Sequence, residues 1–167
     1  MLEYPLLLVF PVAMAFAGVM DLLTYRIPNH VSLALLLGFL FSAPLAGMPL
    51  ADYASHLGAG AMMLAIGIAM FSRGWLGGGD AKLLAAAALW LGFGNLIPFL
   101  VWTAMFGGAL AVVLLMYRRI LPPLWLTKQD WAMRLHDSRH GIPYGIALAG
   151  AGMLVYPTLP WIAGLSG

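Results

Sequence analysis

The sequence has 167 residues, of which 63% are hydrophobic and only 8% are charged, and its formal net charge is +2. Soluble domains carry roughly 25% charged residues, so this composition excludes an ordinary water-soluble domain and favours a protein surrounded by lipid. The absence of cysteine excludes disulfides, thiolate metal sites and a cysteine nucleophile. We expect residues 1–167 to form a single domain.

The first apolar segment covers residues 5–23. It lacks the basic region that opens a secretory signal, and no convincing cleavage pattern follows it, so we expect a retained membrane span. The turn that follows contains Pro28, which cannot continue the preceding helix. The second and third spans are predicted at about 31–47 and 57–71.

A glycine-rich stretch, residues 74–79, separates the third span from a long apolar segment at 81–117. That segment is too long for one span of about 20 residues. Gly92, followed by Gly94 and Pro98, favours a break there, which predicts two spans, the first of them short. The last apolar stretch, 142–165, is expected to form one further span.

The positions of the basic residues support a count of six spans. With six spans, all 8 Lys and Arg residues fall in loops on one face, and short loops rich in these residues stay in the cytoplasm. A single span over 81–117 would instead put Lys82 and Arg118 on opposite faces. The sequence therefore predicts an all-α membrane protein, a bundle of six transmembrane helices with both termini on the extracytoplasmic side.

Two acids lie at the ends of these spans. Asp21 ends the first span and Asp80 begins the fourth, so both are expected at the cytoplasmic boundary and at the same depth. An ionisable group at such a position is costly and usually functional. The alternative for Asp21 is a helix-end charge that reaches the interface, but the matching depth of Asp80 favours catalysis. If the two spans are neighbours, the carboxyl groups cannot both ionise cheaply. One can then accept a proton from water while the other donates to a carbonyl.

Three segments carry a resemblance to a known family: Asp21 with Arg26-Ile27-Pro28-Asn29, then Gly77-Gly78-Gly79-Asp80-Ala81-Lys82-Leu83, and Gly141-Ile142-Pro143-Tyr144-Gly145. In this order and at membrane boundaries, they resemble the type IV prepilin peptidases, which are intramembrane aspartic proteases of the GxGD type. The resemblance covers nearly the whole chain. It implies that Asp21 and Asp80 are a catalytic pair, and that no cofactor or metal takes part.

The resemblance also implies the substrate and the place of action. The pair would cleave the basic leader from prepilins or pseudopilins, whose leader precedes a hydrophobic helix, on the cytoplasmic side of the bacterial inner membrane. Larger members carry a cysteine-containing cytoplasmic insert and also N-methylate the new terminus. This chain has neither cysteine nor an insert between its first two spans. It therefore resembles the short branch that serves tight-adherence (Flp-type) pili, and we expect no N-methyltransferase activity.

Ten residues around the pair are predicted to support the site: Gly77, Gly78, Gly79, Lys82, Arg26, Pro28, Asn29, Pro143, Tyr144 and Gly145. Most have a simpler interpretation. The glycines would serve close helix packing, and the lysine would follow the positive-inside rule. The arginine would orient Asp21 or contact lipid phosphate. The prolines would begin spans two and six, and the tyrosine would be an interfacial aromatic residue.

The segment 118–141 holds most of the charge. Thr127 and Asp130 have the spacing of a capping box, and Trp131 and Leu135 then share one helix face. We expect a short helix in the membrane interface, for which lipid anchoring is favoured over substrate binding.

Other classes of function have weaker support. His136 and His140 have the spacing of a metal pair, but no third ligand accompanies them, so no metal site is predicted. No nucleic-acid-binding patch is present. A proton-coupled transporter needs polar groups along a route through the bilayer, and the later spans contain few. A non-enzymatic subunit of a pilus or secretion assembly stays open, and the oligomeric state is undetermined.

Overall fold

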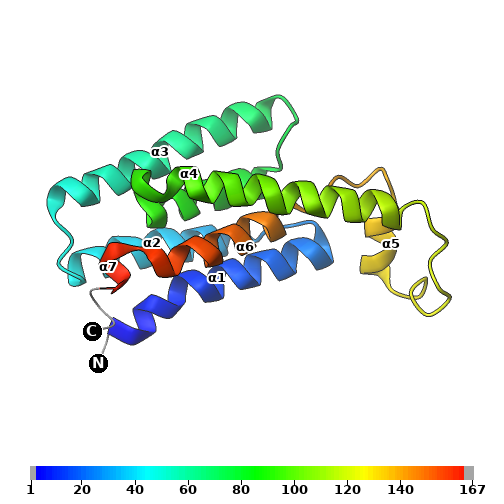
Figure 1. The fold of residues 1–167 in the computed structure, drawn as a ribbon, viewed down its shortest axis with the longest axis horizontal. Helices are drawn as coiled ribbons and strands as arrows, with labels where there is room; N and C mark the ends of the chain where they lie inside the picture. The colour runs from blue at the N-terminus through cyan, green and yellow to red at the C-terminus, as the bar shows by residue number, and fades with distance from the viewer. Residues whose placement is uncertain (1–2, 164–167) are drawn as a thin grey trace.

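The computed structural model describes residues 3–163, and among these residues all regular structure is helical. The helices are α1 (Glu3–Thr24), α2 (Asn29–Leu45), α3 (Leu50–Ser72), α4 (Gly78–Tyr117), α5 (Asp130–His136), α6 (Tyr144–Val155) and α7 (Pro160–Ala163), with a 3-10 turn, η1 (Tyr156–Thr158), before α7. Figure 1 shows an elongated bundle with α5 at one end and α7 at the other. The predicted all-α fold is confirmed.

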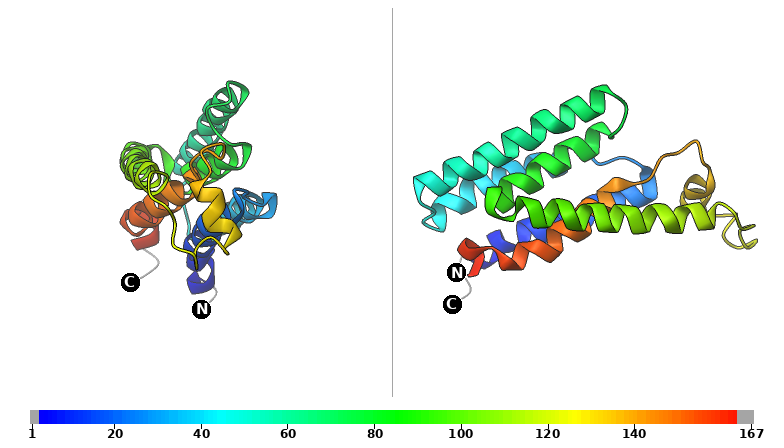
Figure 2. Two further views of the ribbon diagram at one scale, coloured as in Figure 1. Left: turned by 90° about the vertical axis from the view of Figure 1, so that its right-hand side faces the viewer. Right: turned by 45° about the horizontal axis from the view of Figure 1, so that its top comes forward.

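Helix α4 is two helices joined by a sharp reversal at Gly92. This residue has φ 67° and ψ 175°, outside the helical range, and such a backbone is open almost only to glycine. Figures 1 and 2 show the chain turning back on itself at this point. We refer to residues 78–91 as the first arm of α4 and to residues 93–117 as its second arm. The predicted break at this glycine is confirmed.

His56 of α3 holds the reversal in place. Its Nδ1 lies 2.9 Å from the carbonyl oxygen of Leu89, one of the last carbonyls of the first arm, which lack a partner inside their own helix. A Cβ at Gly92 would lie 2.7 Å from the Nε2 atom of His56. The imidazole also stacks on Phe39 of α2, with ring centroids 5.4 Å apart. One histidine therefore joins α2 and α3 to the end of the first arm of α4, at the reversal.

The first arm of α4 forms the centre of the bundle. Residues 83–92 are all buried, and α2, α3 and α6 pack against α4. The largest buried side chain is Trp90, whose indole N–H donates a hydrogen bond of 2.8 Å to the carbonyl oxygen of Leu35. A helix that is apolar all round has no solvent-facing side, so this arm is a core element although it is short.

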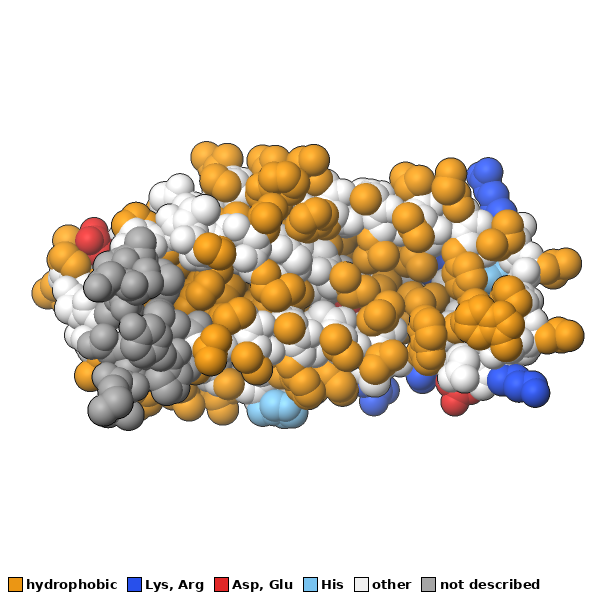
Figure 3. All heavy atoms as spheres, turned by 60° about the horizontal axis from the view of Figure 1, so that its bottom comes forward, with side chains coloured by type: hydrophobic (Ala, Val, Ile, Leu, Met, Phe, Trp, Pro, Cys, Tyr) orange, Lys and Arg blue, Asp and Glu red, His pale blue; other side chains and the backbone are white. Residues whose placement is uncertain are grey.

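The outside of the bundle is strongly apolar. Helices α3 and α4 are each long and apolar enough to cross a membrane, while residues 8–24 and 29–45 form shorter apolar helices. With α4 divided at Gly92, six apolar segments fit the predicted bundle of six: α1, α2, α3, the two arms of α4, and α6. Figure 3 shows hydrophobic side chains spread over one face, with Lys and Arg side chains toward one end.

Several boundaries differ from those predicted. Helix α3 begins at Leu50 rather than at 57, so Asp52 lies in its first turn, where a carboxylate interacts favourably with the helix dipole. Helix α6 ends at Val155, well before 165, because the prolines that follow cannot continue it.

The predicted capping box is wrong. Helix α5 begins at Asp130 after Gln129, with no side-chain cap. The Thr127 hydroxyl instead donates to the carbonyl oxygen of Leu124, at 2.8 Å. A threonine hydroxyl can bond to the nearby backbone of a turn as readily as to a helix end, and here the turn retains it.

Candidate active site

A pocket of about 670 Å³ opens where α1 ends and where α2 and α4 begin. It is lined by Met20, Asp21, Thr24, Tyr25, Arg26, Ile27, Pro28, Asn29, Gly77, Gly78, Gly79 and Asp80. The acids among these residues are Asp21 and Asp80, which are far apart in the sequence. The pocket therefore brings together the two carboxyl groups singled out by their positions at span ends.

Asp21 is held by the backbone of α6. Its side chain is only 5% exposed, and its Oδ2 accepts a 2.7 Å hydrogen bond from the N–H of Gly145. That N–H belongs to the first turn of α6, where backbone donors lack partners in the helix and the dipole favours a negative charge. The contact fixes the orientation of the Asp21 carboxyl group.

The hydrogen bond between α6 and Asp21 requires a residue as small as glycine at position 145. A Cβ there would lie 2.8 Å from both Asp21 Oδ2 and Ile27 Cδ1, distances that real side chains do not show. The absence of a side chain lets the α6 backbone approach the carboxylate directly.

Asp80 is the third residue of α4, after the N-cap residue Gly77. Its carboxylate accepts a hydrogen bond from the N–H of Gly77, as the acidic member of a capping box does. Its Oδ1 atom is buried and has no hydrogen-bond partner among the described residues. A buried oxygen without a partner is costly, so this atom is a candidate for contact with water or a substrate.

Ile27 connects the surroundings of the two acids. Besides its contact at Gly145, its Cβ lies 3.1 Å from where a Cβ of Gly79 would be. The isoleucine therefore packs between the start of α4 and the start of α6. It lies within the Arg26–Asn29 motif, but we had not predicted a role for it, because no sequence pattern shows which apolar side chain fills a gap between two glycines.

Tyr25 was also missed. It lines the pocket directly after α1 and has φ 55°, a conformation that costs a non-glycine residue on the order of 1–3 kcal/mol and that tends to occur at functional sites. Its ring lies 5.4 Å from that of His140. Burial raises the pKa of the Tyr25 hydroxyl, and the nearby Arg118 guanidinium opposes this shift.

The structure divides the predicted supporting residues into two groups. Those that line the pocket are Arg26, Pro28, Asn29, Gly77, Gly78 and Gly79. Outside it, Lys82 donates from Nζ to Asn29 Oδ1 at 2.8 Å, and Pro143 is buried just before α6. Tyr144 points elsewhere, since its ring occupies the space beside Gly107 in the second arm of α4.

Two arginines hold the charged segment that follows α4. Arg118 donates to the carbonyl oxygens of Leu135, His140 and Gly141 at 2.8–2.9 Å. Arg134 donates to the carbonyl oxygen of Leu23, at 3.0 Å. The first set fixes the approach to α6, and the second ties α5 to the last turn of α1.

The two histidines of this segment serve separate contacts. His136 Nε2 lies 3.1 Å from the carbonyl oxygen of Ile120. His140 Nδ1 lies 3.5 Å from a carboxylate oxygen of Asp137. The backbone N–H of Arg139 donates to that carboxylate and holds the pKa of Asp137 below its usual value.

Comparison with known proteins gives one match. A family model described as the type IV leader peptidase family matches residues 8–112, a range that includes Asp21, Asp80 and the reversal at Gly92. No curated protein and no solved structure matches the chain significantly.

Proposed function

The chain belongs to the type IV leader peptidase family, and from this premise we propose that it is an aspartic prepilin peptidase. Its substrate would be a prepilin or pseudopilin, and the reaction would be removal of the basic leader at the cytoplasmic boundary of the bacterial inner membrane. The observation that carries the proposal is the convergence of Asp21 and Asp80 on one pocket.

The chemistry follows from two carboxyl groups that share a confined space. One stays protonated while the other is ionised, because two adjacent negative charges are costly. The ionised group takes a proton from water, and the water oxygen attacks the peptide carbonyl carbon as the protonated group donates to the carbonyl oxygen. When the tetrahedral intermediate collapses, a hydroxyl on its carbon returns a proton to the carboxyl group that donated one, the C–N bond breaks, and the leaving nitrogen takes the proton that the other carboxyl group accepted from water. The pair titrates as a unit, so neither role is assigned to one residue.

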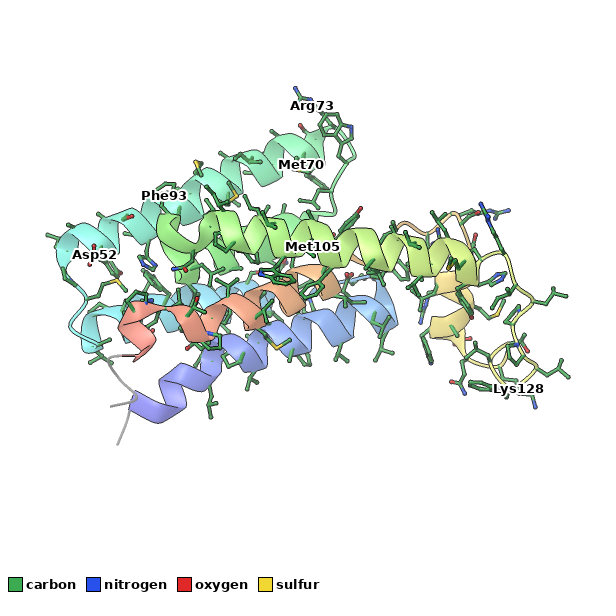
Figure 4. All side chains as sticks on the ribbon, in the orientation of Figure 1. Asp52, Met70, Arg73, Phe93, Met105 and Lys128 are labelled. Carbon is green, nitrogen blue, oxygen red and sulfur yellow. The ribbon has the colours of Figure 1, made fainter. Side chains whose placement is uncertain are left out.

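We further propose that the six apolar segments cross the membrane with the site at the cytoplasmic face. The distribution of charge supports this orientation. In Figure 4, Lys128 lies at one end of the molecule and Asp52 lies at the other, while Arg73 lies between them at the end of α3 remote from Asp52. Lys and Arg favour the cytoplasmic side, and the Asp21–Asp80 pocket opens beside the glycine stretch that follows Arg73.

The short connection between α1 and α2 supports assignment to the Flp-type branch. Helix α1 ends at Thr24 and α2 begins at Asn29, so residues 25–28 are the whole connection. No inserted domain stands at the place where larger members carry one. We therefore propose cleavage without N-methylation of the product.

The proposal is tested by Asp21→Asn and Asp80→Asn, with a co-expressed, C-terminally tagged Flp-type prepilin as substrate. Each variant keeps the shape of the side chain but cannot act as an acid or a base. Each should lower the initial rate of processing by a factor of at least about 10² to 10⁴. Asp52→Asn, at the opposite end of the bundle, is the matched control and should process normally. Normal cleavage by either pocket variant, when present in the membrane at the control level, would refute the catalytic assignment.

A further inference from the structure

A second hollow, of about 370 Å³, lies beside the candidate site. It runs between α2 and α3 over the first arm of α4, and we call it the α2–α3 groove. Its lining residues are Asn29, Ser32, Leu33, Leu36, Leu57, Gly60, Ala61, Leu64, Lys82, Ala85, Ala86 and Leu89. Figure 2 shows α3 tilted away from the other helices, and the groove lies on the side where α3 faces α2.

The groove adjoins the Asp21–Asp80 pocket. Asn29 lines both hollows, and its side chain is joined to Lys82 Nζ at 2.8 Å. This hydrogen-bonded pair lies at the boundary between the pocket and the groove. A polypeptide that extends from the acid pair along the membrane would pass the pair and enter the groove.

Charge selects which part of a substrate would enter. Lys82 forms no ion pair with an acid in the part of the chain that the structure describes, and Arg26 lines the pocket close by. A basic leader is repelled by two such cations, and its charges cannot enter an apolar groove. The hydrophobic stretch on the C-terminal side of the scissile bond has no such conflict.

The residues that line the groove also suit close helix packing. Small residues at Gly60, Ala61, Ala85 and Ala86 line its floor and one wall, and small side chains let helix backbones approach closely in a membrane. From Lys82 to Leu89 the groove follows about 10 Å of the first arm, or two helical turns. Leucines from α2 and α3 supply apolar walls on both sides.

We propose that the α2–α3 groove seats the hydrophobic helix of the substrate, just beyond the scissile bond. The proposal rests on the proposed function, because it takes the substrate to be a basic leader followed by an apolar helix. The groove then fixes the cleavage position, since a helix seated in it presents the preceding peptide bond to the acid pair. Lipid acyl chains are the competing occupant.

Contact is tested by photocrosslinking in the Asp80→Asn background, where the tagged Flp-type prepilin should stay intact. Benzoylphenylalanine is placed at Ala61 in the groove, or at Ala104, an exposed alanine in the second arm of α4 that does not line it. The expected result is a prepilin adduct from position 61 at least about tenfold stronger than from 104. Equal adducts, or only lipid adducts from position 61, would overturn the proposal.

Occupancy is tested with Asp80 intact by filling the groove with Ala61→Phe. The added ring should lower kcat/KM for the same prepilin in proteoliposomes by about tenfold, which corresponds to about 1.4 kcal/mol. Ala104→Phe adds the same ring to a lipid-facing surface and should leave processing unchanged. Normal processing by Ala61→Phe would refute the proposed role of the groove but would not bear on the catalytic role proposed for Asp21 and Asp80. Cleavage by Asp80→Asn itself would instead refute the proposed function.

Discussion

At the scale of single residues, the site depends on where side chains are absent. The N–H of Gly145 reaches Asp21 because no Cβ stands between α6 and the carboxylate. Gly77 likewise leaves space for Asp80, since a Cβ there would lie 2.8 Å from its Oδ2. Both acids are therefore oriented by backbone N–H groups, which are rigid and lose little entropy on forming the contact.

Gly145→Ala is predicted to impair processing strongly. The new methyl group would lie 2.8 Å from Asp21 Oδ2 and Ile27 Cδ1, so α6 must move away and the hydrogen bond must lengthen. Forced overpacking of this kind costs about 1–3 kcal/mol. The measurement is the initial rate of prepilin cleavage in membranes, together with the unfolding temperature in detergent.

Gly141→Ala is the matched control for this prediction. Gly141 lies four residues earlier in the same motif, and nothing lies within 4 Å of a Cβ placed there. It should process and unfold like the original protein. If the two variants behaved alike, the contact between α6 and Asp21 would not be what makes Gly145 necessary.

This pair of glycines also shows what the sequence could reveal about the site. Asp21 and Asp80 could be predicted, because acids at the ends of apolar spans are conspicuous. Close packing was the simpler interpretation of Gly145, and Gly141 has an equivalent place in the same motif. Only the approach of α6 distinguishes them. The positive φ of Tyr25 had no signal either, because a tertiary environment imposes it.

At the scale of helices, the reversal at Gly92 decides the architecture. Without it, α4 would be a single rod of 40 residues, about 60 Å long and twice the thickness of the hydrocarbon core of a bilayer. The reversal places a short arm, buried from residue 83 onward, in the centre of the bundle, with Asp80 near its start. The position of that acid therefore depends on the turn at the far end of the arm.

Gly92→Ala is predicted to destabilise the protein. The residue would have to adopt φ 67° beside the ring of His56, 2.7 Å from the new Cβ, and the strained backbone alone costs on the order of 1–3 kcal/mol. Thermal unfolding in detergent should show a clear fall in Tm. Gly94→Ala serves as the control, because nothing lies within 4 Å of its Cβ. An unchanged Tm for Gly92→Ala would mean that the reversal is not held by this geometry.

The helices themselves were predictable, and their ends less so. Apolar composition and glycine or proline breaks identified all six apolar segments. The start of α3 was placed too late because Asp52 marks a polar loop in sequence, whereas the helix dipole accepts it in the first turn. The capping box failed for a related reason: Thr127 can satisfy either a turn or a helix end.

At the scale of the whole molecule, the fold brings the end of α1 and the start of α4 to one side of the bundle. Both helices pack extensively against α2 and α6, so the acids meet across a pocket that these shared neighbours help to frame. This order of helices could not be read from the sequence. Helices that are apolar on every side show no face that identifies their neighbours.

The central claim is that Asp21 and Asp80 face each other in the folded protein within a membrane. The chain has no native cysteine, so the double variant Asp21→Cys/Asp80→Cys carries the only two thiols. Treatment of native membranes with a short bifunctional thiosulfonate should link these thiols within one molecule, seen as protection of both from later maleimide labelling. The pair Asp21→Cys/Asp52→Cys, whose second position lies at the opposite end of the bundle (Figure 4), should not link. Failure of the first pair to link, or equal linking of both pairs, would contradict the account.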